Sequence, residues 1–137
     1  MKSVVICGSR RFKPEIREFA KRLKRVGIVV FEPYLLLNPE DEWKAMSDEH
    51  KKFIILGLTH DHFYKIRMAD VVLVYNKNGY CGNSTTLEIG YAVAAGKPLY
   101  ALSADEELCR CVLFRGIVKS PKELIKYLIF IHAAYII

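Results

Sequence analysis

The sequence Val71-Val-Leu-Val-Tyr75 is followed by a loop over 76–83 that contains two glycines, and then by an apolar run that ends at Gly96. A short apolar run bounded by turn-forming residues predicts a buried strand, and the longer run predicts a helix that a glycine terminates. A further apolar run, Leu99–Leu102, predicts the next strand. Strand, helix and strand in this order indicate two parallel strands joined by a crossing helix.

The same alternation continues on both sides of this unit. Residues 34–52 show no regular pattern, so we expect a loop with a short helical turn there. The remaining expected strands are Ser3–Cys7, Ile28–Phe31 and Ile117-Val118, and the expected helices are Glu15–Val26, Thr59–Met68, Asp105–Phe114 and one starting at Ser120. Together they predict a three-layer α/β fold, flavodoxin-like (Rossmann-like), with a five-stranded parallel sheet in the order 2-1-3-4-5.

Composition limits the class of protein. The 137 residues, of which 52% are hydrophobic and 26% charged, predict a single compact domain over 1–137. No 18-residue apolar run is present and the N-terminal apolar run is short, so we expect a cytoplasmic protein without a membrane span. The net charge of +6 favours an anionic ligand. Because no nucleic-acid-binding motif is visible, a small phosphorylated ligand is the better expectation.

Glu88 is the only charged residue between Lys77 and Lys97. The helix around it is apolar on nearly every side, which predicts burial, and a buried carboxylate must be paired or take up a proton. A Gly- and Asn-rich loop leads into this helix, so Glu88 is a candidate for chemistry. The alternative is a capping box, in which Glu88 reaches back to the backbone of Thr85.

In an open α/β sheet, ligands bind beyond the carboxyl ends of the strands. Gly8, Ser9 and Arg10 follow the first strand and offer close backbone approach, a hydroxyl and a guanidinium group. Gly82, Asn83 and Ser84 stand in the loop before the Glu88 helix, where some of the polar groups must cap that helix. We expect these six residues to bind the ligand, although an ordinary strand-to-helix turn would also explain Gly8 and Ser9.

Two further features concern metals and partners. His60 and His62 lie two positions apart on a helix and so point to different faces, and the four cysteines lack metal-site spacing, so we expect neither a metal nor a cofactor. Asp61 could form a surface ion pair with Lys65. The apolar segment 127–137 either covers the sheet or forms a subunit interface, and we expect a homo-oligomer, most simply a homodimer, through apolar helical surfaces including it.

Several motifs resemble the nucleoside 2-deoxyribosyltransferase superfamily and its branch of deoxynucleoside 5'-monophosphate N-glycosidases. The resembling stretches are Cys7-Gly8-Ser9, Ala69-Asp-Val-Val-Leu-Val74, Leu87-Glu-Ile-Gly-Tyr-Ala-Val-Ala-Ala-Gly-Lys-Pro98 and Arg115-Gly116. The resemblance implies that Glu88 is a nucleophile that attacks C1' of the sugar and expels the base. It implies a second acid that protonates the departing base, at the position held by His62 with Asp61 one residue before.

If the chain is such an enzyme, the residues at the carboxyl ends of the strands supply its ligand-binding groups. Ser9 and Arg10 would bind the sugar or phosphate end, Asn83 and Ser84 would lie near the ribose, and the basic loop favours a nucleoside 5'-monophosphate over a free nucleoside. The expected function is cleavage or transfer of an N-glycosidic bond of a (deoxy)nucleoside or nucleotide, by a hydrolase or a transferase. The alternatives are a non-catalytic nucleotide-binding module of the same fold and a structural subunit that binds a partner.

Overall fold

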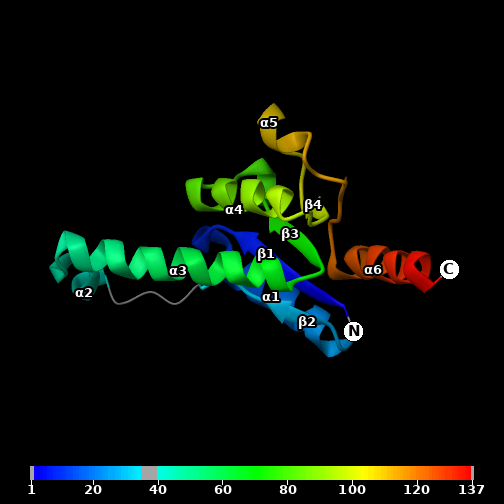
Figure 1. The fold of residues 1–137 in the computed structure, drawn as a ribbon, viewed down its shortest axis with the longest axis horizontal. Helices are drawn as coiled ribbons and strands as arrows, with labels where there is room; N and C mark the ends of the chain where they lie inside the picture. The colour runs from blue at the N-terminus through cyan, green and yellow to red at the C-terminus, as the bar shows by residue number, and fades with distance from the viewer. Residues whose placement is uncertain (1, 35–39, 137) are drawn as a thin grey trace.

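The computed structural model describes residues 2–34 and 40–136, with side chains described as far as Ile129. The strands are β1 (Ser3–Gly8), β2 (Val29–Phe31), β3 (Val71–Tyr75), β4 (Leu99–Ala101) and β5 (Gly116–Ile117). The helices are α1 (Lys13–Arg25), α2 (Glu40–Ala45), α3 (Asp48–Met68), α4 (Asn83–Ala94), α5 (Leu108–Cys111) and α6 (Pro121–Ile136). Short 3-10 turns, Arg10–Phe12 and Lys77–Gly79, follow β1 and β3 (Figure 1).

The five strands form a parallel sheet in the order β2-β1-β3-β4-β5, which confirms the predicted topology. The central strands β1 and β3 pair over their full length, with Cys7 opposite Val74 and Gly8 opposite Tyr75. Both strands are apolar and buried, as expected for strands covered on two faces. Their carboxyl ends, where the predicted ligand loops begin, therefore lie side by side.

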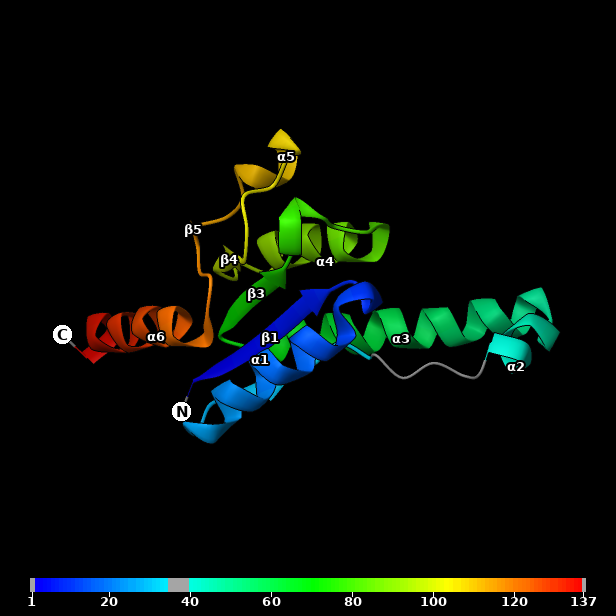
Figure 2. The same cartoon turned by 180° about the vertical axis from the view of Figure 1, so that it is seen from behind.

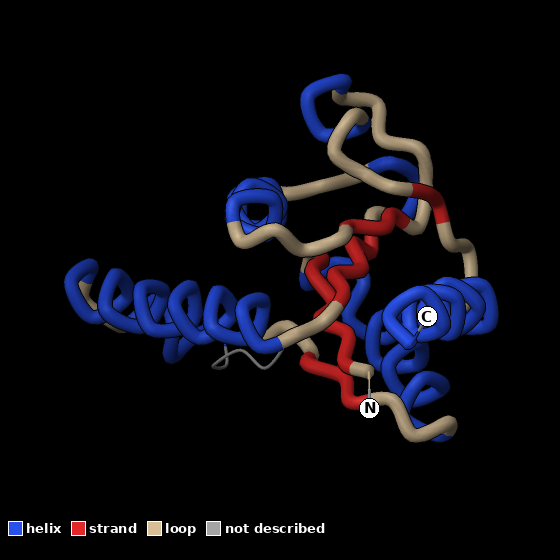
Figure 3. Tube along the Cα trace, turned by 45° about the vertical axis from the view of Figure 1, so that its right-hand side comes forward, coloured by secondary structure: helices blue, strands red, loops and turns tan. Residues whose placement is uncertain are grey.

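Alternate residues of each strand point to opposite faces of the sheet and create two cores. On one face, Ile6 and Leu73 pack with α1 and α6. On the other face, Cys7 and Val74 pack with Ile66 of α3 and with α4. Figure 3 shows the sheet between these two layers of helices. Cys7 therefore faces the same layer as Glu88, and this placement brings the functional groups together.

Helix α3 is longer than the sequence predicted. It starts at Asp48, capped by the Ser47 hydroxyl, which accepts a hydrogen bond from the backbone N–H of His50. The predictions that this helix begins at Thr59 and that an irregular segment reaches residue 52 are therefore wrong. The first half of α3 extends beyond the sheet (Figures 1 and 2), and its apolar residues lie on several sides, so the 3.6-residue periodicity of a helix packed on one face is missing.

The helix predicted over Asp105–Phe114 is also wrong in extent, because only Leu108–Cys111 is helical. The residues before it form a turn, in which the Asp105 carboxylate accepts a hydrogen bond from the backbone N–H of Glu107. An aspartate bonded to the backbone two residues on favours a turn over a helix.

The C-terminal segment forms α6, which the Ser120 hydroxyl caps as predicted. Leu124 and Leu128 are buried in the core beside α1, so this helix covers one face of the sheet. The prediction that residues 127–137 form an interface falls largely on side chains outside the described residues. No helix in the described part of the chain is long and apolar enough to cross a membrane.

Candidate functional site

Glu88 lies in the second turn of α4, because that helix begins three residues earlier than the sequence suggested. Its N-cap is Gly82, which is extended and makes no side-chain hydrogen bond to cap the helix. The first helical residue is Asn83. A capping-box glutamate occupies the third helical position, which here is Thr85. The capping explanation of Glu88 is therefore wrong, and its burial needs another reason.

Glu88 is part of a cluster of three ionisable side chains from three elements. His62 Nε2 of α3 lies 3.6 Å from Glu88 Oε2 and 3.3 Å from Cys7 Sγ at the end of β1. Cys7 is fully buried and His62 is 4% exposed, whereas the Glu88 side chain keeps 15% exposure. The cluster is thus open to solvent only on the side of the Glu88 carboxylate.

Packing between α3 and α4 holds His62 against Glu88. Phe63 and Tyr91 stack in parallel with their ring centroids 4.3 Å apart, next to His62 and one turn after Glu88. His62 Nδ1 is buried and has no hydrogen-bond partner among the described residues, so the ring is fixed by packing and by its Nε2 contacts. An unpaired buried nitrogen is rare in native proteins and is typical of functional sites.

Burial controls the charge of these groups, because it disfavours the ionised form of each. Burial raises the pKa of Glu88 to about 7, and a hydrogen bond from Cys7 partly opposes this rise. It lowers the pKa of His62 to about 4, helped by the charge of Lys65 and opposed by Asp61. Burial, then the Glu88 charge, raises the pKa of the Cys7 thiol. Near pH 7 the site therefore holds a neutral imidazole, a thiol and a carboxyl group that readily changes its protonation state.

The structure separates the two candidate proton donors. Asp61 forms an ion pair with Lys65 at 2.9 Å and its side chain is 49% exposed, so the expected surface pair is observed. His62, one residue later and rotated by about 100° around the helix axis, faces Glu88 instead. The structure therefore brings His62, but not Asp61, into contact with Glu88.

The residues after β1 have both structural and ligand-facing features. A Cβ atom on Gly8 would lie 2.8 Å from Ile16 Cδ1 and 3.3 Å from the carbonyl oxygen of Tyr75, so Gly8 allows close packing between β1, β3 and α1. The Ser9 hydroxyl accepts a hydrogen bond from the backbone N–H of Arg11 and caps the following turn. Arg10 is exposed, and Arg11 lies over the Tyr80 ring at 3.7 Å from its centroid. The basic loop after β1 thus contacts the loop after β3.

Gly82, Asn83 and Ser84 lie at the start of α4, and the side chains of Asn83 and Ser84 are exposed. Thr86 donates a hydrogen bond to the carbonyl of Gly82, which stabilises this first turn. A Cβ atom on Gly82 would meet only the Tyr80 hydroxyl, at 3.7 Å. The predicted ligand-binding residues therefore leave polar atoms accessible one to two turns before Glu88.

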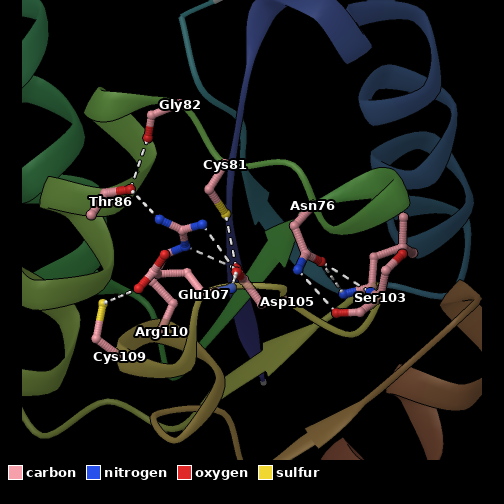
Figure 4. Close-up of polar contacts among 10 residues, drawn as sticks. Asn76, Cys81, Gly82, Thr86, Ser103, Asp105, Glu107, Cys109 and Arg110 are labelled. Atoms are coloured by element: carbon pink, nitrogen blue, oxygen red, sulfur yellow. Dashed lines mark hydrogen bonds and ion pairs between the residues drawn. The ribbon is translucent and has the colours of Figure 1, made fainter.

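Three residues that fix the loops, the buried Asn76 and Asp105 and the partly buried Arg110, were missed by the sequence reasoning (Figure 4). Asn76 is fully buried; its side-chain oxygen accepts from the backbone N–H groups of Leu102 and Ser103, and its amide donates to the carbonyl of Ser103. Asp105 forms two hydrogen bonds with the Arg110 guanidinium, at 2.9 and 3.0 Å. A polar residue directly after a buried strand and an acid–base pair five residues apart were the available signals.

The same network decides the role of Cys81. Its sulfur lies 3.5 Å from Asp105 Oδ2, and burial together with the Asp105 charge raises the pKa of Cys81 to about 12. A thiol that stays protonated at neutral pH is a poor nucleophile, so the arrangement supports a structural role for Cys81.

Cavity size does not mark the site. One hollow of about 850 Å³ lies on the opposite face of the sheet, where Phe19, Tyr75 and Leu102 contribute to its lining. A smaller one of about 270 Å³ lies at the loop after β3, between Tyr80 and Arg110. The chemistry of the Cys7, His62 and Glu88 cluster, rather than a volume, identifies the candidate site.

The chain matches the family model of the nucleoside 2-deoxyribosyltransferases over residues 4–123. No curated protein sequence matches it. Among solved structures it is similar to a 2-deoxyribosyltransferase from the psychrotolerant bacterium Bacillus psychrosaccharolyticus, with 16% identity, a TM-score of 0.61 and 89% of each chain covered.

Two other solved structures are also similar. A CMP N-glycosidase from Clostridium botulinum has 20% identity and a TM-score of 0.54, with 94% of this chain and 99% of that chain covered. A conserved protein from Enterococcus faecalis V583 has 18% identity and a TM-score of 0.58, with 92% and 96% covered. At these identities the structural similarities establish the fold.

Proposed function

The chain belongs to the nucleoside 2-deoxyribosyltransferase family, and from this premise we propose that it cleaves or transfers the N-glycosidic bond of a nucleoside or nucleoside 5'-monophosphate. The observation that carries the proposal is the position of Glu88, a mostly buried carboxyl group that still reaches solvent beside His62. A carboxyl group with a pKa of about 7 is a nucleophile in its ionised form, which is well populated near neutral pH.

In the proposed reaction, the Glu88 carboxylate attacks C1' of the sugar as the bond from C1' to the base nitrogen breaks. The electron pair of that bond leaves with the base, which takes up a proton. Water or a second base then attacks C1', releases Glu88 and completes hydrolysis or transfer. Two displacements at one carbon retain the configuration at C1', as in retaining glycosidases.

We assign the movement of the proton to His62. Its Nε2 atom faces the Glu88 carboxyl group at 3.6 Å and, on closing to hydrogen-bond distance, would accept the proton that Glu88 must lose before attack. The resulting imidazolium is a strong acid in this buried site and can pass the proton to the departing base. Asp61 is the other candidate from the sequence, but it pairs with Lys65 on the exposed side of α3 and does not contact Glu88.

We propose a 5'-monophosphate as the preferred substrate class. Arg10 and Arg11 lie in the loop after β1, and a guanidinium group can form two hydrogen bonds with a phosphate. Ser9 contributes its hydroxyl group at the same edge of the sheet, and Gly8 keeps the backbone close to it. Gly82, Asn83 and Ser84, at the start of α4, would contact the ribose.

We further propose a homodimer. The exposed apolar side chains on α3 include Phe53 at 75%, Leu56 at 57% and Met68 at 54%, and Leu87 on α4 is exposed at 64%. Exposed apolar groups at this density on neighbouring helices are typical of protein interfaces. In the proposed homodimer, a second copy of the chain would cover these exposed apolar side chains.

The test is incubation of the purified protein with a panel of nucleosides and 5'-monophosphates, with and without a free acceptor base, followed by chromatography. Release of base from monophosphates, lost in Glu88→Gln and kept in the surface control Glu18→Gln, would support a nucleotide N-glycosidase. Exchange of bases would support a transferase. If no product forms but one nucleotide raises the melting temperature, the result would favour the non-catalytic binding module. The structural argument for that module is that His62 is neutral near pH 7 and carries no extra proton to donate from its resting state.

A further inference from the structure

The cluster of Cys7, His62 and Glu88 also has the composition of a transition-metal site. It offers one sulfur, one imidazole nitrogen and one carboxylate oxygen, and these donor atoms all lie within 4.8 Å of one another. Three protein ligands with an open fourth position are the pattern of zinc sites that remain accessible to water or another ligand. The ligands come from β1, α3 and α4, so no sequence spacing could reveal the set.

The distances between donors fit a tetrahedral ion. Zinc bonds of about 2.0 Å to nitrogen or oxygen and about 2.3 Å to sulfur, at tetrahedral angles, place neighbouring donors about 3.3–3.6 Å apart. The two measured separations are 3.3 Å from Cys7 Sγ to His62 Nε2 and 3.6 Å from His62 Nε2 to Glu88 Oε2. Each lies within about 0.3 Å of the value for such an ion, about 3.5 Å for the sulfur–nitrogen pair and about 3.3 Å for the nitrogen–oxygen pair. The second is too long for a good hydrogen bond, so coordination would replace a weak contact.

The chemistry of the donors selects the metal. A thiolate and an imidazole are ligands for zinc and its neighbours in the first transition row, whereas magnesium and calcium prefer sets made only of oxygen. His62 is almost fully buried and its Nε2 atom points at the other two donors. Its Nδ1 atom lacks the hydrogen-bond partner that strong zinc sites supply, which indicates reversible rather than permanent binding.

We propose that Cys7, His62 and Glu88 bind a zinc ion reversibly, and that zinc and substrate exclude each other at this site. Zinc binding rests on the geometry alone, and the mutual exclusion rests on the proposed function of Glu88. The metal would approach from the solvent-facing side of Glu88 and hold its carboxylate as a ligand, releasing the Cys7 proton to solvent. The expectation of no metal site rested on the spacing of His60 with His62 and on that of the four cysteines, whereas here the three donors come from separate elements.

Cobalt(II) titration tests zinc binding without any assay of activity, because a cobalt–thiolate bond gives a charge-transfer absorption band. The parent protein carries Cys109→Ser and Cys111→Ser, which removes the two exposed thiols as competing ligands. We expect a saturable band that equimolar zinc abolishes. In the same parent, Cys7→Ser should remove the band, and Cys81→Ser should leave the band unchanged. His62→Gln should weaken cobalt binding by more than ~10–100-fold, which is the loss of affinity typical when an outer-sphere partner is removed.

Two results would overturn the proposal: a parent without a thiolate band at saturating cobalt, or a band of full intensity in Cys7→Ser. Circular dichroism confirms that each variant is folded, and His62→Gln provides an independent reading if Cys7→Ser does not fold. The exclusion is tested separately, as inhibition of base release by zinc that a chelator reverses. A cobalt band without catalysis would leave zinc binding intact and refute the proposed function, whereas catalysis without a band would do the reverse.

Discussion

Glu88→Gln should change the pH dependence of stability in a direction that follows from burial. Glutamine keeps the shape of the side chain and cannot ionise. In the native protein the folded-state pKa of Glu88 is raised from 4.5 to about 7, so the folded state holds a proton that the unfolded state has lost. At about 1.4 kcal/mol per pKa unit, ionising Glu88 in the folded state costs about 3 kcal/mol.

The sign of the effect follows from linkage. The contribution of Glu88 to stability is fully present below pH 4.5 and is lost as the pH rises through 7. Between pH 5 and pH 8 the native protein should therefore lose about 2.5 kcal/mol relative to Glu88→Gln. The titration of His62 occurs in both proteins and cancels in this comparison.

The assay is urea unfolding of both proteins at pH 5 and pH 8, at one protein concentration and with a chelator present. The exposed residue Glu18 provides the matched control, because Glu18→Gln should show the pH dependence of the native protein. Equal pH dependence of Glu88→Gln and the native protein would refute the argument that burial holds a proton on Glu88. A large loss of stability in Glu88→Gln at both pH values would assign Glu88 a structural role.

Three further predictions follow from other residues. Folding lowers the pKa of His62 from 6.5 to about 4, so its contribution to stability is present above pH 6.5 and is lost as the pH falls to 4. His62→Gln should therefore remove about 3 kcal/mol of acid-induced destabilisation, which urea unfolding at pH 7 and pH 4 measures. Asn76→Ala leaves buried backbone groups near Ser103 without partners and should cost about 2–4 kcal/mol in chemical denaturation, whereas wild-type stability would show that water replaces the amide. Gly79→Ala places a Cβ atom 2.8 Å from the carbonyl oxygen of Ala104 at a φ of +78°, so the melting temperature should fall by several degrees, and an unchanged value would contradict the described loop contact.

The sequence was sufficient for the sheet, because its strands are short apolar runs separated by turn-forming residues. It was not sufficient for α3, whose first half projects from the core and so carries no one-sided apolar pattern. Nor could it set the start of α4, since Ser84 and Thr85 are better capping residues by type than Gly82, the actual N-cap.

The candidate site was predictable only in part. Glu88 stood out because it is the single charge in an apolar run. Cys7 lies at the end of a strand that the sequence predicts, and that position does not reveal that it faces His62 across the layer between sheet and helices. Likewise, the choice between Asp61 and His62 depends on the rotation of α3 about its axis, which tertiary packing sets. Local patterns do not encode contacts between residues 55 positions apart.

The most direct test of Glu88 as a nucleophile is trapping of the sugar–enzyme ester. A substrate nucleotide with fluorine at C2' slows both displacements, and intact-mass analysis after acid quenching measures the adduct. The account predicts one added sugar phosphate per chain, located by peptide mapping on Glu88 and absent from Glu88→Gln. An adduct on another residue, or turnover of the unmodified substrate by Glu88→Gln at the native rate, would contradict it.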